Sequence, residues 1–345
     1  MVTSENTSKK QRIEWIDTAK GFCIMLVVFN HTFLFLDLKD HIPPILYDYL
    51  NSFRMPLYFF LSGVFFKTYG SLSNFTRKKI NKLIIPFLFF YTVFSILIPY
   101  ITIKAGYNYP YVNSENSLYS FCFDFYNNDC QLVNGPLWFL LCLFEINIIF
   151  YVINSVFKKE SNIYLLSIIC GAIGITLSVL SINIPISIDT SFTCLPFFCF
   201  GYYIRNHTTI ISNKNIDNRL ILYSMACGII LIFFTRHVEF HTNELSNSSL
   251  FTVHIAGITG TMMVIFLSKR IGKIYLISYL GRFSIIILCT HLLLIELYLP
   301  LLNRFLPQIP CLFILFIIII ISELVIIPLF VKYLPYVTAQ KDLLP

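Results

Sequence analysis

Three titratable side chains lie on one face of the first long apolar segment. Asp17, Lys20 and His31 are separated by three and eleven residues within the block WIDTAKGFCIMLVVFNH. At about 100° per residue, eleven helical steps make three turns plus roughly 20°, so a helix here places all three on one face. The rise from Lys20 to His31 is about 16 Å at 1.5 Å per residue. This face therefore joins a cation that can bind an anion to an imidazole that can act as a base.

Other titratable side chains interrupt later apolar runs: Arg54, Glu145, His291 and Glu323, with Glu296 nearer to an end. A charge at the centre of a membrane helix costs about 2.5–3.5 kcal/mol on insertion scales, so such residues usually face a cavity or a partner. Arg54 is a candidate donor to a developing oxyanion; alternatively, it pairs with Glu145. We expect His291 to form a second polar wall of the same cavity. Glu323 has no evident partner.

The composition requires a bilayer as the solvent. Hydrophobic residues make up 57% of the 345 residues and charged residues 12%, whereas soluble domains are about a quarter charged. Apolar runs close to the roughly 20 residues that cross about 30 Å of hydrocarbon recur along the chain. We therefore expect an all-α polytopic membrane protein, one domain over residues 1–345, with about ten transmembrane helices. The predicted spans are 19–38, 46–66, 83–103, 136–157, 163–182, 189–204, 219–236, 250–268, 283–301 and 310–331.

The distribution of Lys and Arg predicts the orientation. With ten spans and a cytoplasmic N-terminus, most of the 25 basic residues fall in inner segments, as the inside-positive rule requires. Both termini are then cytoplasmic, with an N-terminal segment 1–18, an outer loop 104–135 and a tail 332–345. This bias accounts for the net charge of +7, so we expect no nucleic-acid partner. We also expect no removable signal peptide.

The outer loop leaves two questions open. It holds Cys122 and Cys130, which could pair in an oxidising space, although sequence alone does not fix the geometry. The loop is also rich in Tyr and Phe, which either stack on sugar rings or lie in the membrane interface.

Several motifs resemble the membrane acyltransferase type 3 family, in its branch of fucose 4-O-acetylase-like and surface-glycan O-acetyltransferases. Lys20 and His31 match the family pattern of Arg or Lys, ten residues, then His. The segment 52–66, SFRMPLYFFLSGVFF, resembles the family signature MPLFFxxSG. Further matches are GPLWFL at 135–140 and LGRFS followed by His at 280–291. The likeness covers essentially the whole chain, with one departure: this branch often has His where Arg54 stands.

The resemblance implies transfer of an acyl group, usually acetyl from acetyl-CoA on the cytoplasmic side, to a hydroxyl of a cell-surface polysaccharide or its lipid-linked precursor. The implied location is the bacterial inner membrane. A sugar hydroxyl needs a base within hydrogen-bond reach, and His31 is the candidate; a packing histidine is the alternative. Asp17 orients Lys20 or caps the helix. The remaining candidates are Arg54, Glu145 and His291 for catalysis and Trp138 and Ser62 for substrate binding, and no metal is expected.

A basic cluster follows the second apolar run. It consists of Arg77, Lys78, Lys79 and Lys82. Together with Lys20, these cations suit the phosphates of CoA, because clustered cations bind phosphate well. Anchoring at the cytoplasmic membrane surface explains Lys78, Lys79 and Lys82 equally well, so Lys20 and Arg77 are the stronger candidates for the phosphates.

A transporter or a lipid-linked glycan flippase is the rival interpretation, because buried charges and ten spans are natural for either. The motifs and the lack of a visible internal repeat favour the acyltransferase.

Overall fold

The computed structural model describes residues 12–41, 43–97, 100, 104, 134–213, 217–245 and 250–345. Cys122, Cys130 and most of the predicted outer loop lie outside the described residues. The described chain is helical, apart from an isolated bridge between Glu239 and Glu244. The all-α prediction is therefore confirmed for this part of the chain.

Each predicted span corresponds to a helical segment. The helices are α1 (Glu14–Phe35), α2 (Pro44–Val64), α3 (Leu72–Lys79), α4 (Ile85–Thr92), α7 (Trp138–Val156), α8 (Glu160–Val179), α9 (Ile188–His207), α10 (Arg219–Phe234), α11 (Leu250–Ile271), α12 (Tyr275–Arg282), α13 (Ser284–Leu302) and α14 (Gln308–Tyr333). Two π-helical turns, Ile80–Ile84 and Val93–Leu97, extend α3 and α4 into one long helix.

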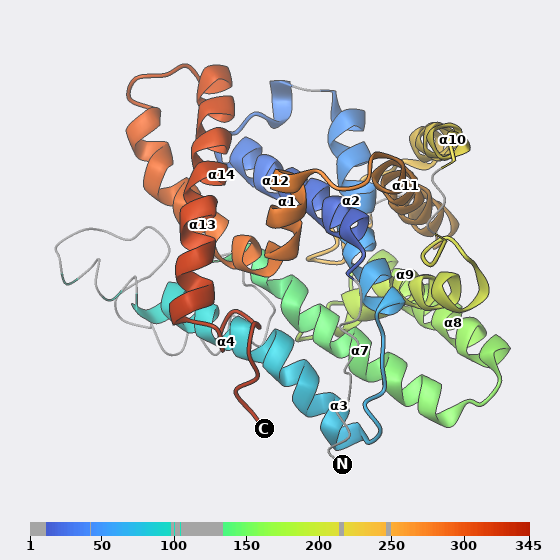
Figure 1. Cartoon of the computed structure of the whole chain (residues 1–345). Coiled ribbons are helices and arrows are strands. Elements are labelled where there is room, and N and C mark those ends of the chain that lie inside the picture. The colour runs from blue at the N-terminus through green and yellow to red at the C-terminus, as the bar shows by residue number, and fades with distance from the viewer. Residues whose placement is uncertain are drawn as a thin grey trace, which may run out of the picture.

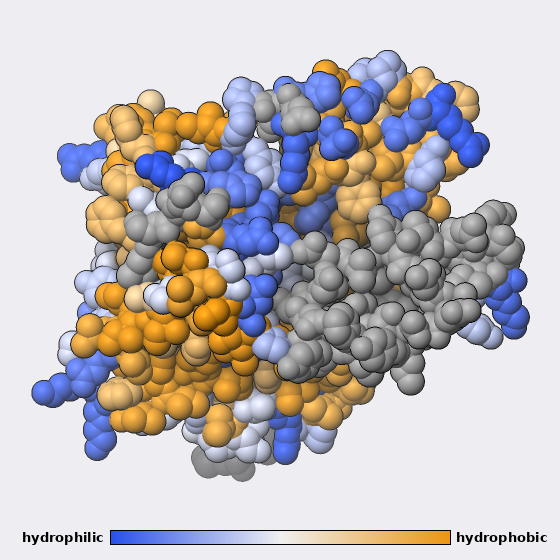
Figure 2. Space-filling view, turned by 180° about the vertical axis from the view of Figure 1, so that it is seen from behind, coloured by the Kyte–Doolittle hydropathy of each residue, from blue (hydrophilic) through white to orange (hydrophobic). Residues whose placement is uncertain are grey.

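Within the described residues, six helices are long and apolar enough to cross a membrane: Glu14–Phe35, Gly135–Val156, Glu160–Val179, Phe251–Ile271, Ser284–Leu302 and Gln308–Tyr333. The other predicted spans are shorter or less apolar, so the number ten stays a prediction, whereas a polytopic membrane protein is confirmed. Helix α14 exposes Ile317, Ile321 and Val325, four residues apart on one face, as a lipid-facing helix does. Figure 2 shows apolar side chains over much of one side of the molecule and polar ones in a recess near its middle.

Helix α1 runs through the middle of the bundle, with α13 and α14 side by side at one end and α10 and α11 at the other (Figure 1). Glycines set how closely α1 approaches α12. A Cβ added to Gly21 would lie 2.0 Å from the carbonyl oxygen of Ile277, and one added to Gly281 would lie 1.9 Å from that of Asp17. Small residues allow such close crossings in membrane helices. The tight α1–α12 crossing fixes the helix that carries Lys20 and His31.

Hydrogen bonds between distant connections join segments predicted to lie on the same side of the membrane. On the inner side, Arg205 donates to the carbonyl oxygen of Phe66 at 2.7 Å. On the outer side, the hydroxyl of Tyr47 donates to Glu239 at 3.2 Å. These contacts agree with the predicted succession of inner and outer segments.

Candidate active site

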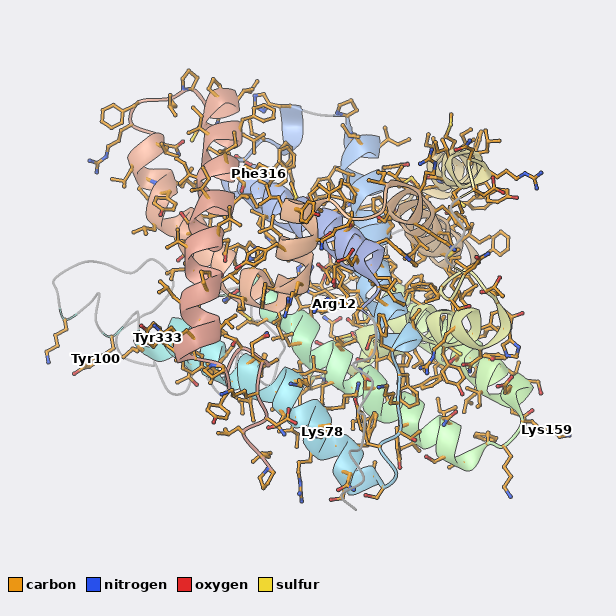
Figure 3. The ribbon with its side chains drawn as sticks, in the orientation of Figure 1. Arg12, Lys78, Tyr100, Lys159, Phe316 and Tyr333 are labelled. Carbon is orange, nitrogen blue, oxygen red and sulfur yellow. The ribbon has the colours of Figure 1, made fainter. Side chains whose placement is uncertain are left out.

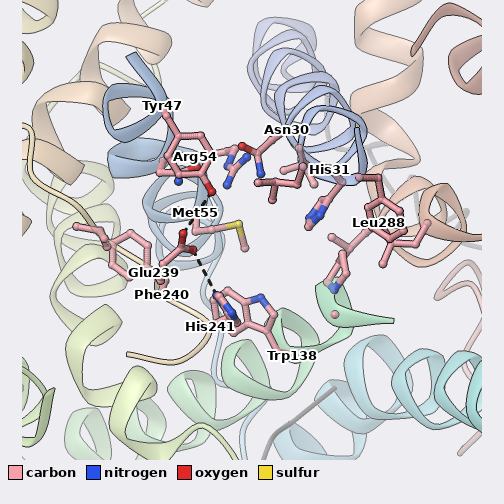
Figure 4. Close-up of a pocket in the computed structure, with 18 of the residues that line it drawn as sticks. Asn30, His31, Tyr47, Arg54, Met55, Trp138, Glu239, Phe240, His241 and Leu288 are labelled. Carbon is pink, nitrogen blue, oxygen red and sulfur yellow. Dashed lines mark hydrogen bonds and ion pairs between the residues drawn. The ribbon is translucent and has the colours of Figure 1, made fainter. Parts of the chain in front are cut away.

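His31 points from α1 into a cavity of about 240 Å³ (Figure 4). The cavity lies between α1, α2, α13, the start of α7 and the connection from α10 to α11. The ring of His31 stands 5.2 Å from that of His291 on α13, centroid to centroid, at an interplanar angle of 49°. The fold therefore brings together the two histidines that the sequence placed 260 residues apart.

His291 is fully buried and has a defined tautomer. Its Nδ1 lies 2.7 Å from the carbonyl oxygen of Ile287, which can only accept, so Nδ1 carries the proton. Its Nε2 has no hydrogen-bond partner among the described residues. The neighbouring Thr290 donates to Glu323 on α14 at 2.7 Å. Glu323 thus has a partner. Its hydrogen bond ties α14 to α13 at the residue next to His291.

Arg54 projects from α2 into the same cavity, beside Asn30 and Tyr47 (Figure 4). Its Nε and Nη1 are buried and, within the described ranges, have no hydrogen-bond acceptor. Buried guanidinium donors without an acceptor carry a large desolvation cost, so such donors mark a place for a ligand anion or a developing oxyanion.

The alternative pairing of Arg54 with Glu145 is not formed. Glu145 lies on α7, where its Oε2 accepts a hydrogen bond from Ser191 of α9 at 2.7 Å. It lines neither the His31 cavity nor the cavity on the side of Lys20. The geometry therefore gives its predicted catalytic role no support, because Glu145 faces α9 rather than α2.

Trp138 does line the His31 cavity, as predicted for a substrate-binding residue. The segment that leads into α7 is tied to α13, because the side-chain amide of Asn134 donates to the carbonyl oxygen of Cys289 at 3.0 Å. Pro136 stands in the first helical turn, where its missing N–H costs nothing. The GPLWFL motif thus fixes an indole at the wall of the cavity, close to the part of α13 that carries His291.

Sequence reasoning missed several residues of the cavity, and four of them are consecutive: Val238, Glu239, Phe240 and His241. They belong to the connection between α10 and α11, which has no helical periodicity. Glu239 accepts from Tyr47 and lies 3.5 Å from Nδ1 of His241, as the dashed lines of Figure 4 mark. The signal that could have found them is the density of titratable groups in the run HVEFH directly after an apolar helix.

A second cavity, of about 400 Å³, lies on the side of Lys20, and we call it the basic mouth. Lys20, Lys79 and Lys82 line it, together with Ser62. The side chain of Leu288 lines both this mouth and the His31 cavity.

The same helices form both cavities. On α1, Lys20 and Ile24 line the basic mouth, whereas Val27 and His31 line the other cavity. Helix α2 contributes Tyr58 to the mouth and Met55 to the His31 cavity. Helix α7 contributes Phe139 to the mouth and Trp138 to the His31 cavity. Tyr58 and Phe139 pack ring against ring, with centroids 5.6 Å apart. The two cavities are therefore stacked along the same helices, and Leu288 lies between them and lines both.

Loss of solvent lowers the pKa of Lys79 in the basic mouth to about 8. The other two cations at this mouth differ in their contacts. The ammonium of Lys20 lies 5.5 Å from the ring centroid of Phe65, whereas Lys82 forms an ion pair of 3.1 Å with Asp342. These cations supply donors for an anionic group at one end of the stacked cavities.

The C-terminal tail covers part of the predicted phosphate-binding cluster. Asp342 pairs with Lys78 as well as with Lys82, and these hydrogen bonds hold the pKa of Asp342 below its usual value. Arg77 donates to the carbonyl oxygen of Pro345 at 2.7 Å. Asn81 accepts from the backbone amides of residues 343 and 344, each at 2.8 Å. Arg77 and Lys78 therefore contact the tail and do not line the mouth; Lys78 projects outward in Figure 3.

Asp17 lies apart from both cavities. Its carboxylate, 8% exposed as a residue, forms an ion pair with Arg12. Along an ideal helix it is about 21 Å from His31, at 1.5 Å per residue. Asp17 lines a third hollow together with Lys20, a position that agrees with the predicted role of orienting Lys20 and not with contact to reacting atoms in the His31 cavity.

Comparisons with known proteins agree with these motifs. Neither curated proteins nor solved structures gave a match. A family described as an acyltransferase domain matches residues 13–327, which include both cavities and all the helices from α1 to α13. The chain is therefore a member of the acyltransferase 3 family and a membrane acyltransferase.

Proposed function

We propose that this enzyme transfers an acetyl group from acetyl-CoA to a hydroxyl of a cell-envelope glycan or its lipid-linked precursor, in the bacterial inner membrane. The observation that carries the proposal is the stacking of a cation-lined mouth and a histidine cavity along one face of α1. A donor with an anionic nucleotide end and a slender thioester arm matches that shape. The phosphates meet Lys20, Lys79 and Lys82, and the arm passes Leu288 toward His31.

The reaction needs one base and one set of oxyanion donors. A nitrogen of His31 takes the proton of the acceptor hydroxyl while its oxygen attacks the thioester carbonyl carbon. The carbonyl π electrons move to the oxygen, and the two unsatisfied N–H groups of Arg54 stabilise that oxyanion. When the oxyanion collapses, the C–S bond breaks and the CoA thiolate recovers the proton from the His31 imidazolium. The products are the acetyl ester and CoA.

His291 acts through His31. Its unprotonated Nε2 faces a buried environment next to the base. An imidazolium formed on His31 during the reaction gains from a neighbouring neutral imidazole, which offers a lone pair and carries no charge. Glu323 keeps His291 in place through Thr290.

A transporter or flippase is the weaker candidate. Membership of an acyltransferase family argues against it.

Membranes that contain the full chain, incubated with acetyl-labelled acetyl-CoA, test the proposal. We expect labelled ester in the envelope fraction and a loss of about 10²–10⁴-fold for His31→Ala, the usual contribution of a positioned base. His207→Ala is the matched control, because His207 is an exposed histidine that pairs with Glu160 at 2.8 Å. Label that stays on CoA in the wild type, or a His31→Ala protein that inserts normally and transfers at the wild-type rate, would contradict the proposal.

A further inference from the structure

We propose that Glu239 is the residue that recognises the acceptor, and that the acceptor is a ring with neighbouring free hydroxyl groups. This inference rests on the function proposed above and extends it to a residue outside the motifs that resemble the family. Glu239 lies in the His31 cavity on the connection from α10 to α11, on the opposite side from the basic mouth.

The connection that carries Glu239 is held rigidly. Residues 239 and 244 exchange backbone hydrogen bonds of 2.9 and 3.0 Å and close a tight turn. Within that turn, buried Asn243 accepts from Thr193 of α9 at 2.8 Å and donates to the carbonyl oxygen of Gly174 of α8 at 3.0 Å. A turn fixed to two helices presents its carboxylate at a constant place, which is what a specificity residue requires.

The carboxylate of Glu239 keeps capacity for a ligand. The side chain of Glu239 is 21% exposed. Its Oε1 accepts a hydrogen bond from Tyr47, and its Oε2 lies 3.5 Å from Nδ1 of His241. Two carboxylate oxygens accept about four hydrogen bonds. The remaining acceptor sites open to the cavity that also holds His31.

The same cavity also holds a hydrogen-bond donor and an aromatic side chain. Arg54 offers N–H donors that have no acceptor in the described chain, and Trp138 forms an aromatic wall. A polyhydroxylated ring satisfies Glu239 and Trp138 together, because its hydroxyls donate to the carboxylate while the C–H face of the ring packs on the indole, and the donors of Arg54 stay free for the oxyanion. An alcohol with a single hydroxyl gives that hydroxyl to His31 and leaves Glu239 without a donor. The cavity therefore selects for more than one hydroxyl.

Transfer to two probe alcohols of the same ring size tests this inference. Full-length protein in membranes receives labelled acetyl-CoA with either a methyl hexopyranoside or cyclohexanol, and acetate release without any acceptor is recorded in parallel. We expect Glu239→Gln to raise the KM for the hexoside about tenfold or more, because a hydrogen bond to a charged group is lost. Its KM for acetyl-CoA, its transfer to cyclohexanol and its acetate release are expected to stay at the wild-type level.

The substitution Glu239→Gln keeps an oxygen for Tyr47, so the turn retains its packing. Glu244→Gln is the matched control, since Glu244 is an exposed residue of the same turn. An unchanged KM for the hexoside in Glu239→Gln would overturn the inference. So would equal losses with hexoside, cyclohexanol and water, which indicate a general structural role. A wild type that hydrolyses acetyl-CoA but prefers cyclohexanol to the hexoside refutes the acceptor class and leaves the use of acetyl-CoA standing.

Discussion

The two stacked cavities differ in how far their polar groups are already satisfied. In the His31 cavity, two nitrogens of Arg54 have no partner within the described ranges, and neither has Nε2 of His291, whose ring lies next to that of His31. At the basic mouth, Lys82 is paired with Asp342, whose segment also covers the outward cations. The His31 cavity therefore has hydrogen-bonding groups available for a reacting centre. At the basic mouth, part of the positive charge is already neutralised by Asp342.

That difference has a physical reason. Free donors in a closed, low-dielectric space stabilise a transition state strongly, because no solvent must reorganise when charge develops. Lys82 and Asp342 are partly exposed, with side-chain exposures of 44% and 27%, and an ion pair of this kind contributes only about 0.2–1 kcal/mol. Substitutions in the cavity should therefore change the rate of chemistry by large factors, and substitutions at the mouth should change donor affinity by small ones.

After His31, the largest effect is expected at Arg54. Arg54→Met should lower kcat about 10²–10³-fold, the usual cost of removing an oxyanion donor, with little change in the KM for acetyl-CoA. Steady-state transfer of labelled acetyl measures both parameters. Arg236→Met serves as the control, because Arg236 is exposed and donates to the carbonyl oxygens of Phe233 and Thr235 at the end of α10, away from both cavities. A rise in the KM for acetyl-CoA with kcat unchanged would show that Arg54 binds the donor and does not stabilise the oxyanion.

Lys20 comes next. It lines the mouth on the same helix face as His31, so Lys20→Met should raise the KM for acetyl-CoA about tenfold and leave kcat nearly unchanged. Lys158→Met, at an exposed position after α7, is the control. If Lys20→Met lowered kcat as much as Arg54→Met, the two cavities would form a single functional unit and the contrast between them would fail.

Much of this contrast was open to sequence reasoning. The spacing of Lys20 and His31 placed a cation and a base on one helix face, and the structure puts them in the two stacked cavities. Helical periodicity and hydropathy sufficed because both residues belong to one continuous element. His291 was expected to form a second polar wall of the cavity because a titratable ring is costly to bury in a membrane; its ring lies 5.2 Å from that of His31, but it is not among the residues that line the cavity.

The remainder depends on contacts between segments far apart in the chain. Glu239 meets Tyr47 across 192 positions, and Asp342 meets Lys78 across 264. Neither pair could be predicted from a local sequence pattern. The sequence of a polar connection or a polar tail does not indicate which part of the molecule it contacts. The alternative prediction, that Arg54 pairs with Glu145, was wrong for the same reason. The partner of Glu145 is Ser191, a neutral residue on a distant helix.

A smaller effect is expected at Lys79, whose pKa is lowered to about 8 by loss of solvent. The ammonium is charged below that pH and neutral above it, so the KM for acetyl-CoA should rise as the pH passes upward through about 8. Lys79→Arg should remove this rise, because a guanidinium stays charged in this range. Donor KM measured from about pH 6.5 to about pH 9.5 brackets this titration and tests the point. A rise of equal size in Lys79→Arg would assign the titration to another group.

The smallest effect, and the one that probes the mouth most directly, is at Asp342. Its carboxylate occupies Lys78 and Lys82, two cations predicted to serve the phosphates of the donor, and only Lys82 of the pair lines the mouth. A donor phosphate must displace it from Lys82, so Asp342→Asn should lower the KM for acetyl-CoA about twofold, in keeping with exposed ion pairs. The gain should shrink as salt is added, because screening weakens the competing pair. Asp217→Asn, which removes an exposed partner of Arg219 elsewhere, should do nothing. A higher donor KM in Asp342→Asn would mean that the tail organises the mouth instead of competing with the donor.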